Sequence, residues 1–430
     1  MTDVGVVSRL ARWAADRRWL PDAQRAVLGY YAETGTFDYR ALALKSQVDD
    51  VMDEVLAELY EAVETELARE FDLPADAVSF AYETKLTLPA ELTLGYLFRR
   101  YRSRATGGYD PVADELAGRD GVLGTFPGVG GRRDETAHRQ RANRELAAEA
   151  SRAREMTAFV VWALLDGDMR DAINDDEFED FVVDVDADAR ATSTELAPRR
   201  VARVAQSRLQ SRVEAGFDDH PDAVRAAYDH AVEVSEAHQA EDDRFRGLMA
   251  AAADDAPVAD ETDAAESDVA DRSPEAARDA IEGEYKYRQM ADDGHPFTDD
   301  ELDLPYLTTQ YDRVGVIYHG MLEMYRGAGF EIEPAFERSI VFAIIGAQVW
   351  LDDVDDYHDD VADGQLTPVT AEYLLADSER AAFESIVEVA EAYFDPARAY
   401  AEAADSTLTG IAVEYILRSG DVSDLPGADG

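Results

Sequence analysis

The chain has 430 residues, with 92 Asp and Glu against 41 Lys and Arg and a formal net charge of -51. A surface this negative repels the phosphate backbone, so we expect no nucleic-acid partner. Because 46% of the residues are hydrophobic and 9% are aromatic, the chain is too apolar for a disordered acidic tail, and we expect it to fold.

Lysine is almost absent, since only Lys45, Lys85 and Lys286 occur and the remaining positive charge is arginine. This composition resembles that of proteins from salt-loving archaea, whose carboxylate-rich surfaces stay hydrated in molar salt. At about 1 M salt the Debye length is only ~3 Å, which screens the self-repulsion of the chain. We therefore expect the halophilic-type chain to lose structure on desalting.

The sequence contains no cysteine, which excludes disulfides, thiolate metal sites and cysteine nucleophiles. Residues Met1 to Leu10 lack a basic region followed by an apolar run, so no signal peptide is predicted. The longest apolar stretches, Thr157–Leu165 and Ile340–Leu351, are shorter than the ~20 residues that a membrane span requires. The expectation is a cytoplasmic protein without a membrane span.

Helical periodicity dominates the chain from its N-terminal part onward. In 41–71, apolar residues recur every three or four positions with charged residues between them. The same spacing predicts further helices over 142–165, 196–215, 222–249, 306–328, 334–362, 370–393 and 397–417. Alternating strand-like segments are nearly absent, so we predict an all-α multi-helix bundle.

Two stretches interrupt the helices. Residues 105–133 are rich in Gly and Pro, which predicts a long loop, and residues 251–283 consist mainly of Ala, Asp, Glu and Ser, which predicts a disordered acidic linker. They separate three predicted helical blocks, 1–104, 134–250 and 284–430.

Three helix boundaries follow from local chemistry. Thr298 and Glu301 fit a capping box, and Thr367 followed by Pro368 fits an N-cap with proline at the first helical position. Gly364 stands where a left-handed residue would end the preceding helix.

That preceding helix, predicted over 334–362 and about 43 Å long, is the most unusual segment. Its first half is apolar nearly all round, which predicts burial by several neighbours and makes it the long central helix of the bundle. Its second half gathers seven aspartates, at 352, 353, 355, 356, 359, 360 and 363. Carboxylates at a helix C-terminus repel the helix dipole and each other, and Mg²⁺ bound by carboxylates and substrate phosphates would compensate them.

The string Gly346-Ala347-Gln348 followed by Asp352-Asp353-Val354-Asp355-Asp356 resembles the aspartate-rich motif of class I isoprenoid synthases. The resemblance implies an all-α bundle in which two acidic motifs hold Mg²⁺ on the diphosphate of a prenyl substrate. It also implies that Asp352, Asp353 and Asp356 are metal ligands, assisted by Asp359. The implied function is a Mg²⁺-dependent prenyl-diphosphate-utilising enzyme of the prenyltransferase or terpene synthase type.

The match departs from the family pattern in one respect. Three residues separate Gln348 from the first aspartate, where prenyl-elongating members usually show two. Gln348, Asp355 and Asp359 also fit the DxxxD register of head-to-head synthases, so the branch stays open.

The acidic composition supplies an alternative interpretation of the motif. The pattern DDxxD occurs six times, starting at positions 49, 218, 299, 352, 355 and 359. Only the group at 352–363 ends an otherwise apolar helix. The alternative to a metal site there is an acidic helix end that faces solvent.

A class I site needs a second acidic motif. The best candidate is the set Asp166, Asp168 and Asp171, which follows the apolar run 159–165. The alternative interpretation is that these aspartates only follow an ordinary helix end at Gly167.

Diphosphate recognition also needs cations, and arginine presents a bidentate fork to phosphate oxygens. Arg313 and Arg326, with Tyr311 and Gln348, are the predicted substrate-binding residues, and helix-surface pairing is their alternative role. No catalytic base is assigned.

Residues 228–246 place His230, His238, Asp242 and Arg246 at spacings of eight and four, for which we expect a polar network between helices. The lone His319 is expected to be structural. The alternative function for the whole chain is a non-catalytic helical adaptor or assembly protein whose acidic clusters are an adaptation to salt, and the oligomeric state stays open.

Overall fold

The chain is mostly helical, which confirms the predicted fold class at this level. The computed structural model describes residues 22–34, 39–82, 86–117, 133–174, 176–185, 196–253, 272–291 and 294–428. Most of the predicted glycine-rich loop and acidic linker lies outside the described residues. Their described margins contain short helices, because Pro111 and Pro274 each stand at the first position of a helix.

The structure divides into two compact units that do not follow the three predicted blocks. Unit 1 comprises Met1–Asp38, Ala226–Glu323 and Glu331–Gly430, and unit 2 comprises Tyr39–Arg225 and Met324–Phe330. The predicted middle block is therefore split between the two units after Arg225.

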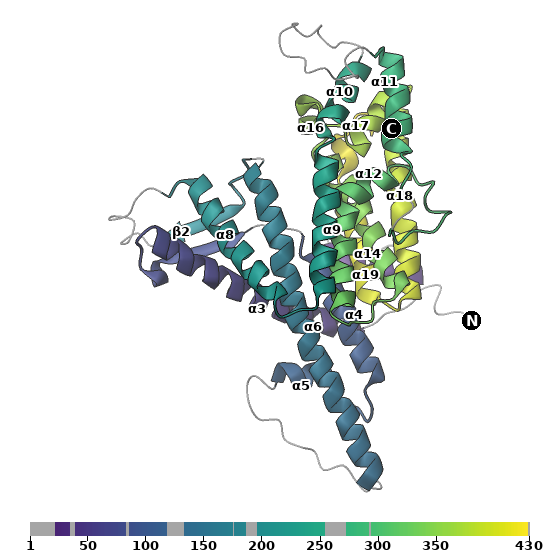
Figure 1. Cartoon of the computed structure of the whole chain (residues 1–430). Coiled ribbons are helices and arrows are strands. Elements are labelled where there is room, and N and C mark those ends of the chain that lie inside the picture. Colours follow the sequence, from purple (N-terminus) through teal and green to yellow (C-terminus); the bar gives the residue numbers. More distant parts are fainter. Residues whose placement is uncertain are drawn as a thin grey trace, which may run out of the picture. The chain divides into compact units, whose positions relative to one another are not determined.

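Unit 2 is built around the long helix α6, which packs against α4, α5 and α8 (Figure 1). The apolar stripe predicted from the sequence in α3 is buried, for example at Val48, Met52 and Leu59. The helices are α3 (Tyr39–Glu70), α4 (Leu88–Arg104), α5 (Pro111–Ala117), α6 (Arg133–Asn174) and α8 (Pro198–Phe217), with the short 3-10 helix η1 (Ala75–Ala77).

A two-stranded ribbon accompanies these helices. Strands β1 (Val78–Tyr82) and β2 (Phe181–Val185) are antiparallel, with Val78 opposite Val185 and Tyr82 opposite Phe181. Every second residue of β1 is buried, as expected for a strand with one covered face. This ribbon was not predicted from the sequence.

Unit 1 is a helical bundle in which α14 packs against α18, and Figure 1 shows the two side by side. Its α-helices, of which α9 begins in unit 2 and α13 ends in unit 2, are α2 (Asp22–Thr34), α9 (Asp222–Gln239), α10 (Asp242–Ala252), α11 (Pro274–Ala280), α12 (Leu307–Gln310), α13 (Val316–Gly327), α14 (Pro334–Ala347), α15 (Asp353–Asp355), α16 (Tyr357–Asp363), α17 (Pro368–Leu375), α18 (Glu379–Ala403) and α19 (Thr407–Ser419). It also contains the π-helical turns η2 (Ile281–Lys286), η3 (Tyr311–Gly315) and η4 (Gln348–Asp352) and the 3-10 helix η5 (Val422–Asp424). Among the described helices, none has the length and apolar character needed to cross a membrane.

Helix α14 lies in the core of unit 1, as its apolar sequence predicts. Ile340, Val341 and Phe342 are fully buried. A Cβ added at Gly346 would lie 2.8 Å from the Phe394 ring, so the glycine allows α18 to approach closely.

The acidic half of the predicted central helix is not a continuous α-helix. After α14 the chain passes through the π turn η4 and the short α15, and then breaks at Asp356 before α16. Gly364 ends α16 with φ 68°, as predicted, and Thr367 caps α17 through Thr370. Glu301 accepts a hydrogen bond from the Thr298 backbone, but a turn follows there instead of a helix.

Candidate functional site

The acidic end of α14–α16 contains two kinds of aspartate. We call the seven residues Asp352, Asp353, Asp355, Asp356, Asp359, Asp360 and Asp363 the aspartate cluster. Asp353 and Asp360 are only 2% and 8% exposed, whereas the other five are exposed. The π turn and the break at Asp356 therefore turn two carboxyl groups inward while most of the cluster faces solvent.

Asp353 has two polar neighbours in unit 1. The Arg313 Nη1 lies 3.1 Å from Asp353 Oδ1, and the Arg313 side chain is 29% exposed. The Gln348 amide donates to Asp352 Oδ2 at 2.8 Å and to Asp353 Oδ1 at 3.3 Å. The structure thus brings together four residues that the sequence predicts for the site, Arg313, Gln348, Asp352 and Asp353.

The buried carboxyls are incompletely satisfied. Asp353 Oδ2 and Asp360 Oδ2 are buried and have no hydrogen-bond partner within the protein. Burial raises the pKa of Asp353 to about 7, although Arg313 opposes the shift. Burial likewise raises the pKa of Asp360 to about 6, again against the effect of Arg313. One arginine therefore does not compensate the carboxylates gathered around it.

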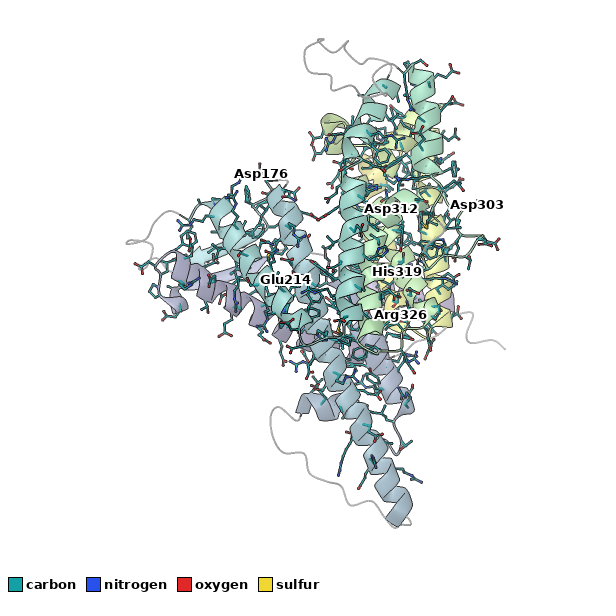
Figure 2. All side chains as sticks on the ribbon, viewed as in Figure 1. Asp176, Glu214, Asp303, Asp312, His319 and Arg326 are labelled. Carbon is teal, nitrogen blue, oxygen red and sulfur yellow. The ribbon has the colours of Figure 1, made fainter. Side chains whose placement is uncertain are left out.

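A cavity of about 320 Å³ lies in unit 1. Its lining consists of His230, Glu233, Val234, Ala237, His238, Glu241, Arg288 and Asp312. Arg288 donates through Nη1 and Nη2 to the two carboxylate oxygens of Glu241, at 2.7 and 3.0 Å. The side chain of Asp312 is labelled in Figure 2. Its lining residues are mostly polar or charged, although apolar atoms make up most of the lining surface, so the cavity suits a small ligand with both polar and apolar groups.

Arg313 connects this cavity electrostatically with the aspartate cluster. Burial lowers the pKa of His238, a lining residue, to about 4, and the positive charge of Arg313 contributes to the shift. Arg313 follows Asp312 directly in η3, and Asp312 lines the cavity while Arg313 pairs with Asp353. Burial raises the pKa of Asp312 to about 6.

The residues of the predicted polar network over 228–246 do not all lie in one place. His230 and His238 both line the cavity. Arg246, by contrast, donates to the backbone carbonyl of Asp363 at 2.9 Å. It therefore supplies a positive charge at the C-terminal end of α16, where the helix dipole favours one.

The predicted second acidic motif lies in unit 2, on α6. Asp166 is 1% exposed and accepts hydrogen bonds from Arg170 at 2.7 Å and from Gln206 at 3.0 Å. The carboxylate of Asp168 interacts with the Tyr82 hydroxyl, and Asp171 is half-buried. Helix α6 continues past Gly167 to Asn174, so Gly167 does not end it. These aspartates and the aspartate cluster belong to different units.

The two remaining predicted substrate-binding residues have other settings. The Tyr311 hydroxyl lies 2.5 Å from His319 Nδ1. Arg326, near the end of α13, is half-buried and falls in unit 2.

Three metal-ligating side chains converge elsewhere in unit 1. Within the part of the chain that the structure describes, His319, Glu323 and Glu337 form the group whose ligand atoms all lie within 4.8 Å of one another. This group was not predicted from the sequence, although the spacing His-x-x-x-Glu within a predicted helix was an available signal. Comparison with known proteins finds no matching family model, no matching curated protein and no matching solved structure.

Proposed function

We propose that unit 1 binds Mg²⁺ together with a diphosphate ester at the aspartate cluster, and that it acts as a prenyl-diphosphate-utilising enzyme of the prenyltransferase or terpene synthase type. One observation carries the proposal. Asp353 and Asp360 each keep a buried carboxyl oxygen without a partner, and Arg313 pairs with Asp353 through the other oxygen. A buried carboxyl oxygen without a partner is costly, and a hard divalent cation with oxygen ligands satisfies it.

The π turn supports the resemblance on which the substrate class rests. A π turn contains about one residue more than an α-helical turn, because its hydrogen bonds run from i to i+5. Gln348 therefore reaches residues four and five positions later, Asp352 and Asp353. The extra residue between glutamine and aspartate, which departs from the prenyl-elongating pattern, is accommodated by η4.

Arg313 fits the phosphate side of such a site. Mg²⁺ at Asp353 would compete with Arg313 for the carboxylate and leave the guanidinium to bind a phosphate oxygen. The metal would withdraw charge from the diphosphate leaving group and so assist its departure from the prenyl carbon.

Calorimetric titration in concentrated KCl tests the proposal. Inorganic diphosphate is added to the whole protein with and without Mg²⁺, followed by farnesyl diphosphate as a prenyl substrate. We expect Mg²⁺-dependent diphosphate binding and slow release of diphosphate from the prenyl ester. The double variant Asp353→Asn/Asp360→Asn should lose both.

A second DDxxD string in the chain provides a matched control for the general effect of removing acidic charge. Asp50 and Asp53 belong to another DDxxD string, on α3, and both are exposed. Asp50→Asn/Asp53→Asn removes the same charge and should leave diphosphate binding unchanged. Equal loss in the two double variants would show general charge effects and contradict the proposed site.

A specific observation also favours the second candidate function, a non-catalytic helical adaptor. Asp353 already has Arg313 as a counter-ion, and Asp352, Asp356 and Asp359 are exposed. In that case the aspartate cluster is a salt-adapted surface with a structural ion pair. The titration then shows weak Mg²⁺ uptake at every acidic patch and no diphosphate binding.

A further inference from the structure

The residues His319, Glu323 and Glu337 come from two helices of unit 1. His319 and Glu323 are four residues apart on α13 and therefore lie on one face of that helix, while Glu337 lies in the first turn of α14. The His319 Nε2 is 3.2 Å from Glu337 Oε1 and 3.8 Å from Glu323 Oε1. The position of His319 in the chain can be followed in Figure 2.

The 3.2 Å separation between His319 and Glu337 matches that of two atoms that share one metal ion, and the 3.8 Å separation from Glu323 is slightly longer. With metal–nitrogen and metal–oxygen bonds near 2.0–2.2 Å, two tetrahedral ligand atoms lie about 3.3 Å apart. An ordinary ion pair needs only one short contact between two groups, and it does not require a third ligand atom to lie close to both. Here all three ligand atoms lie within 4.8 Å of one another.

The other nitrogen of the imidazole has the kind of partner that metal-binding histidines have. Tyr311 Oη lies 2.5 Å from His319 Nδ1. The Tyr311 hydroxyl can accept a hydrogen bond from Nδ1–H in one tautomer of the imidazole. In that tautomer the Nε2 lone pair faces the carboxylates, which is how an outer partner fixes the tautomer of a metal ligand.

Burial differs across the group in a way that suits an open coordination position. The side chains of His319 and Glu337 are 12% and 6% exposed, whereas that of Glu323 is 41% exposed. Two ligands are thus held in the protein interior and the third lies at the solvent side. A metal ion there would have room for a water molecule beside Glu323.

We propose that His319, Glu323 and Glu337 form a binding site for a divalent transition-metal ion of the Zn²⁺ and Co²⁺ kind, with Tyr311 as a positioning residue. An imidazole nitrogen selects such ions over Mg²⁺, which prefers oxygen ligands only. The site shares no ligand with the aspartate cluster and does not depend on diphosphate binding. Three protein ligands plus water are the composition of catalytic zinc sites, and the ion would also clamp α13 to α14.

The visible absorption of bound Co²⁺ tests the proposal, because surface carboxylates alone do not give the expected bands. The full-length protein is stripped with a chelator, exchanged into concentrated KCl and titrated with Co²⁺ while the visible d–d bands are recorded. We expect one equivalent of Co²⁺ to give intense bands of low coordination number, and Zn²⁺ to remove them. Mg²⁺ in excess should leave them in place.

Variants decide whether these residues carry the signal. His319→Gln and Glu337→Gln should abolish the bands, and Tyr311→Phe should weaken Co²⁺ affinity about 10- to 100-fold without moving the stoichiometry. The controls His358→Gln and Glu388→Gln, at exposed positions, should behave as wild type.

Two results would overturn the metal site. One is the absence of intense bands in the wild-type protein. The other is unchanged Co²⁺ affinity in both Glu337→Gln and Tyr311→Phe, which keep the imidazole and so remain informative even if His319→Gln fails to fold. Either result would leave an ordinary polar contact between histidine and glutamate, and neither would affect the outcome of the Mg²⁺ and diphosphate titration.

Discussion

The Arg313 guanidinium lies 3.1 Å from the Asp353 carboxyl, and each of the two residues stands at a π-helical turn. Arg313 belongs to η3, and Asp353 directly follows η4. π turns are rare and occur frequently at functional sites. The two turns therefore carry the ion pair at the centre of the proposed diphosphate site.

Removing the arginine should destabilise unit 1. In Arg313→Gln the buried Asp353 carboxylate loses its counter-ion, and we expect the free energy of unfolding to fall by about 3 kcal/mol. Urea denaturation in concentrated KCl measures the change. The double variant Arg313→Gln/Asp353→Asn should recover most of the loss, because the buried charge of Asp353 is then removed together with its counter-ion. A double variant as unstable as the single one would show that the ion pair is not the cause.

The buried His238 should make stability depend on pH. Burial lowers its pKa to about 4 in the folded protein, against about 6.5 in the unfolded chain. Above about pH 6.5 both states are neutral. As the pH falls towards 4, the unfolded state takes up a proton that the folded state excludes, so stability is lost by at most ~1.4 kcal/mol per pH unit.

The His238 contribution is isolated by comparison with His238→Asn. Asp312, Asp353 and Asp360, whose pKa values burial raises to about 6, 7 and 6, have the opposite sign and lose stability as the pH rises, so the wild-type curve alone is not diagnostic. Between pH 7.5 and 4.5, the melting temperature of the wild type should decrease relative to that of His238→Asn as the pH falls. His358→Asn, at an exposed position, should follow the wild type. Parallel curves for all three proteins would contradict the prediction.

A buried amide offers a stabilising substitution. Gln310 is 0% exposed, and neither its Nε2 nor its Oε1 has a hydrogen-bond partner within the protein. Methionine has a similar length without the amide, so Gln310→Met should raise the free energy of unfolding by about 1–2 kcal/mol. Thermal melting checks this. A lower melting temperature would show that a bound water satisfies the amide.

Two helical glycines in unit 2 should respond to alanine in opposite directions. A Cβ at Gly216 would lie 2.5 Å from the Phe159 ring, so Gly216→Ala should destabilise the protein by roughly 1–3 kcal/mol. At Gly167 no atom lies within 4 Å of the added Cβ, and alanine there should stabilise α6 by up to about 1 kcal/mol. Urea denaturation of both variants checks the signs, and equal effects would contradict the close packing of α8 on Phe159.

Features of the fold that depend on neighbouring residues in the chain could be predicted from the sequence. The apolar stripe of α3 and the end of α16 at Gly364 follow from spacing and from glycine's tolerance of positive φ. The cap at Thr367 follows from its hydroxyl and the proline after it. The ribbon of β1 and β2 could not be predicted, because each strand has five residues and pairs with a partner about a hundred residues away.

The candidate site was predicted only in part for the same reason. The aspartate string is local, but the burial of Asp353 depends on η4, and its pairing with Arg313 joins residues forty positions apart. The group of His319 and Glu337 likewise forms only when α13 and α14 are packed together. Helical periodicity assumes a constant number of residues per turn, so it cannot place side chains beyond a π turn.

The additional residue in η4 has a consequence for how this helix can change over time. One residue corresponds to about 100° of rotation around an α-helix. The direction in which the aspartates after η4 point therefore depends on the number of residues in η4, and not on the packing of the apolar half. Substitutions in α14 that improve its packing against α18 do not change the direction of those aspartates. Loss of a single residue within η4 would instead rotate every following aspartate at once, while the core of unit 1 kept its composition.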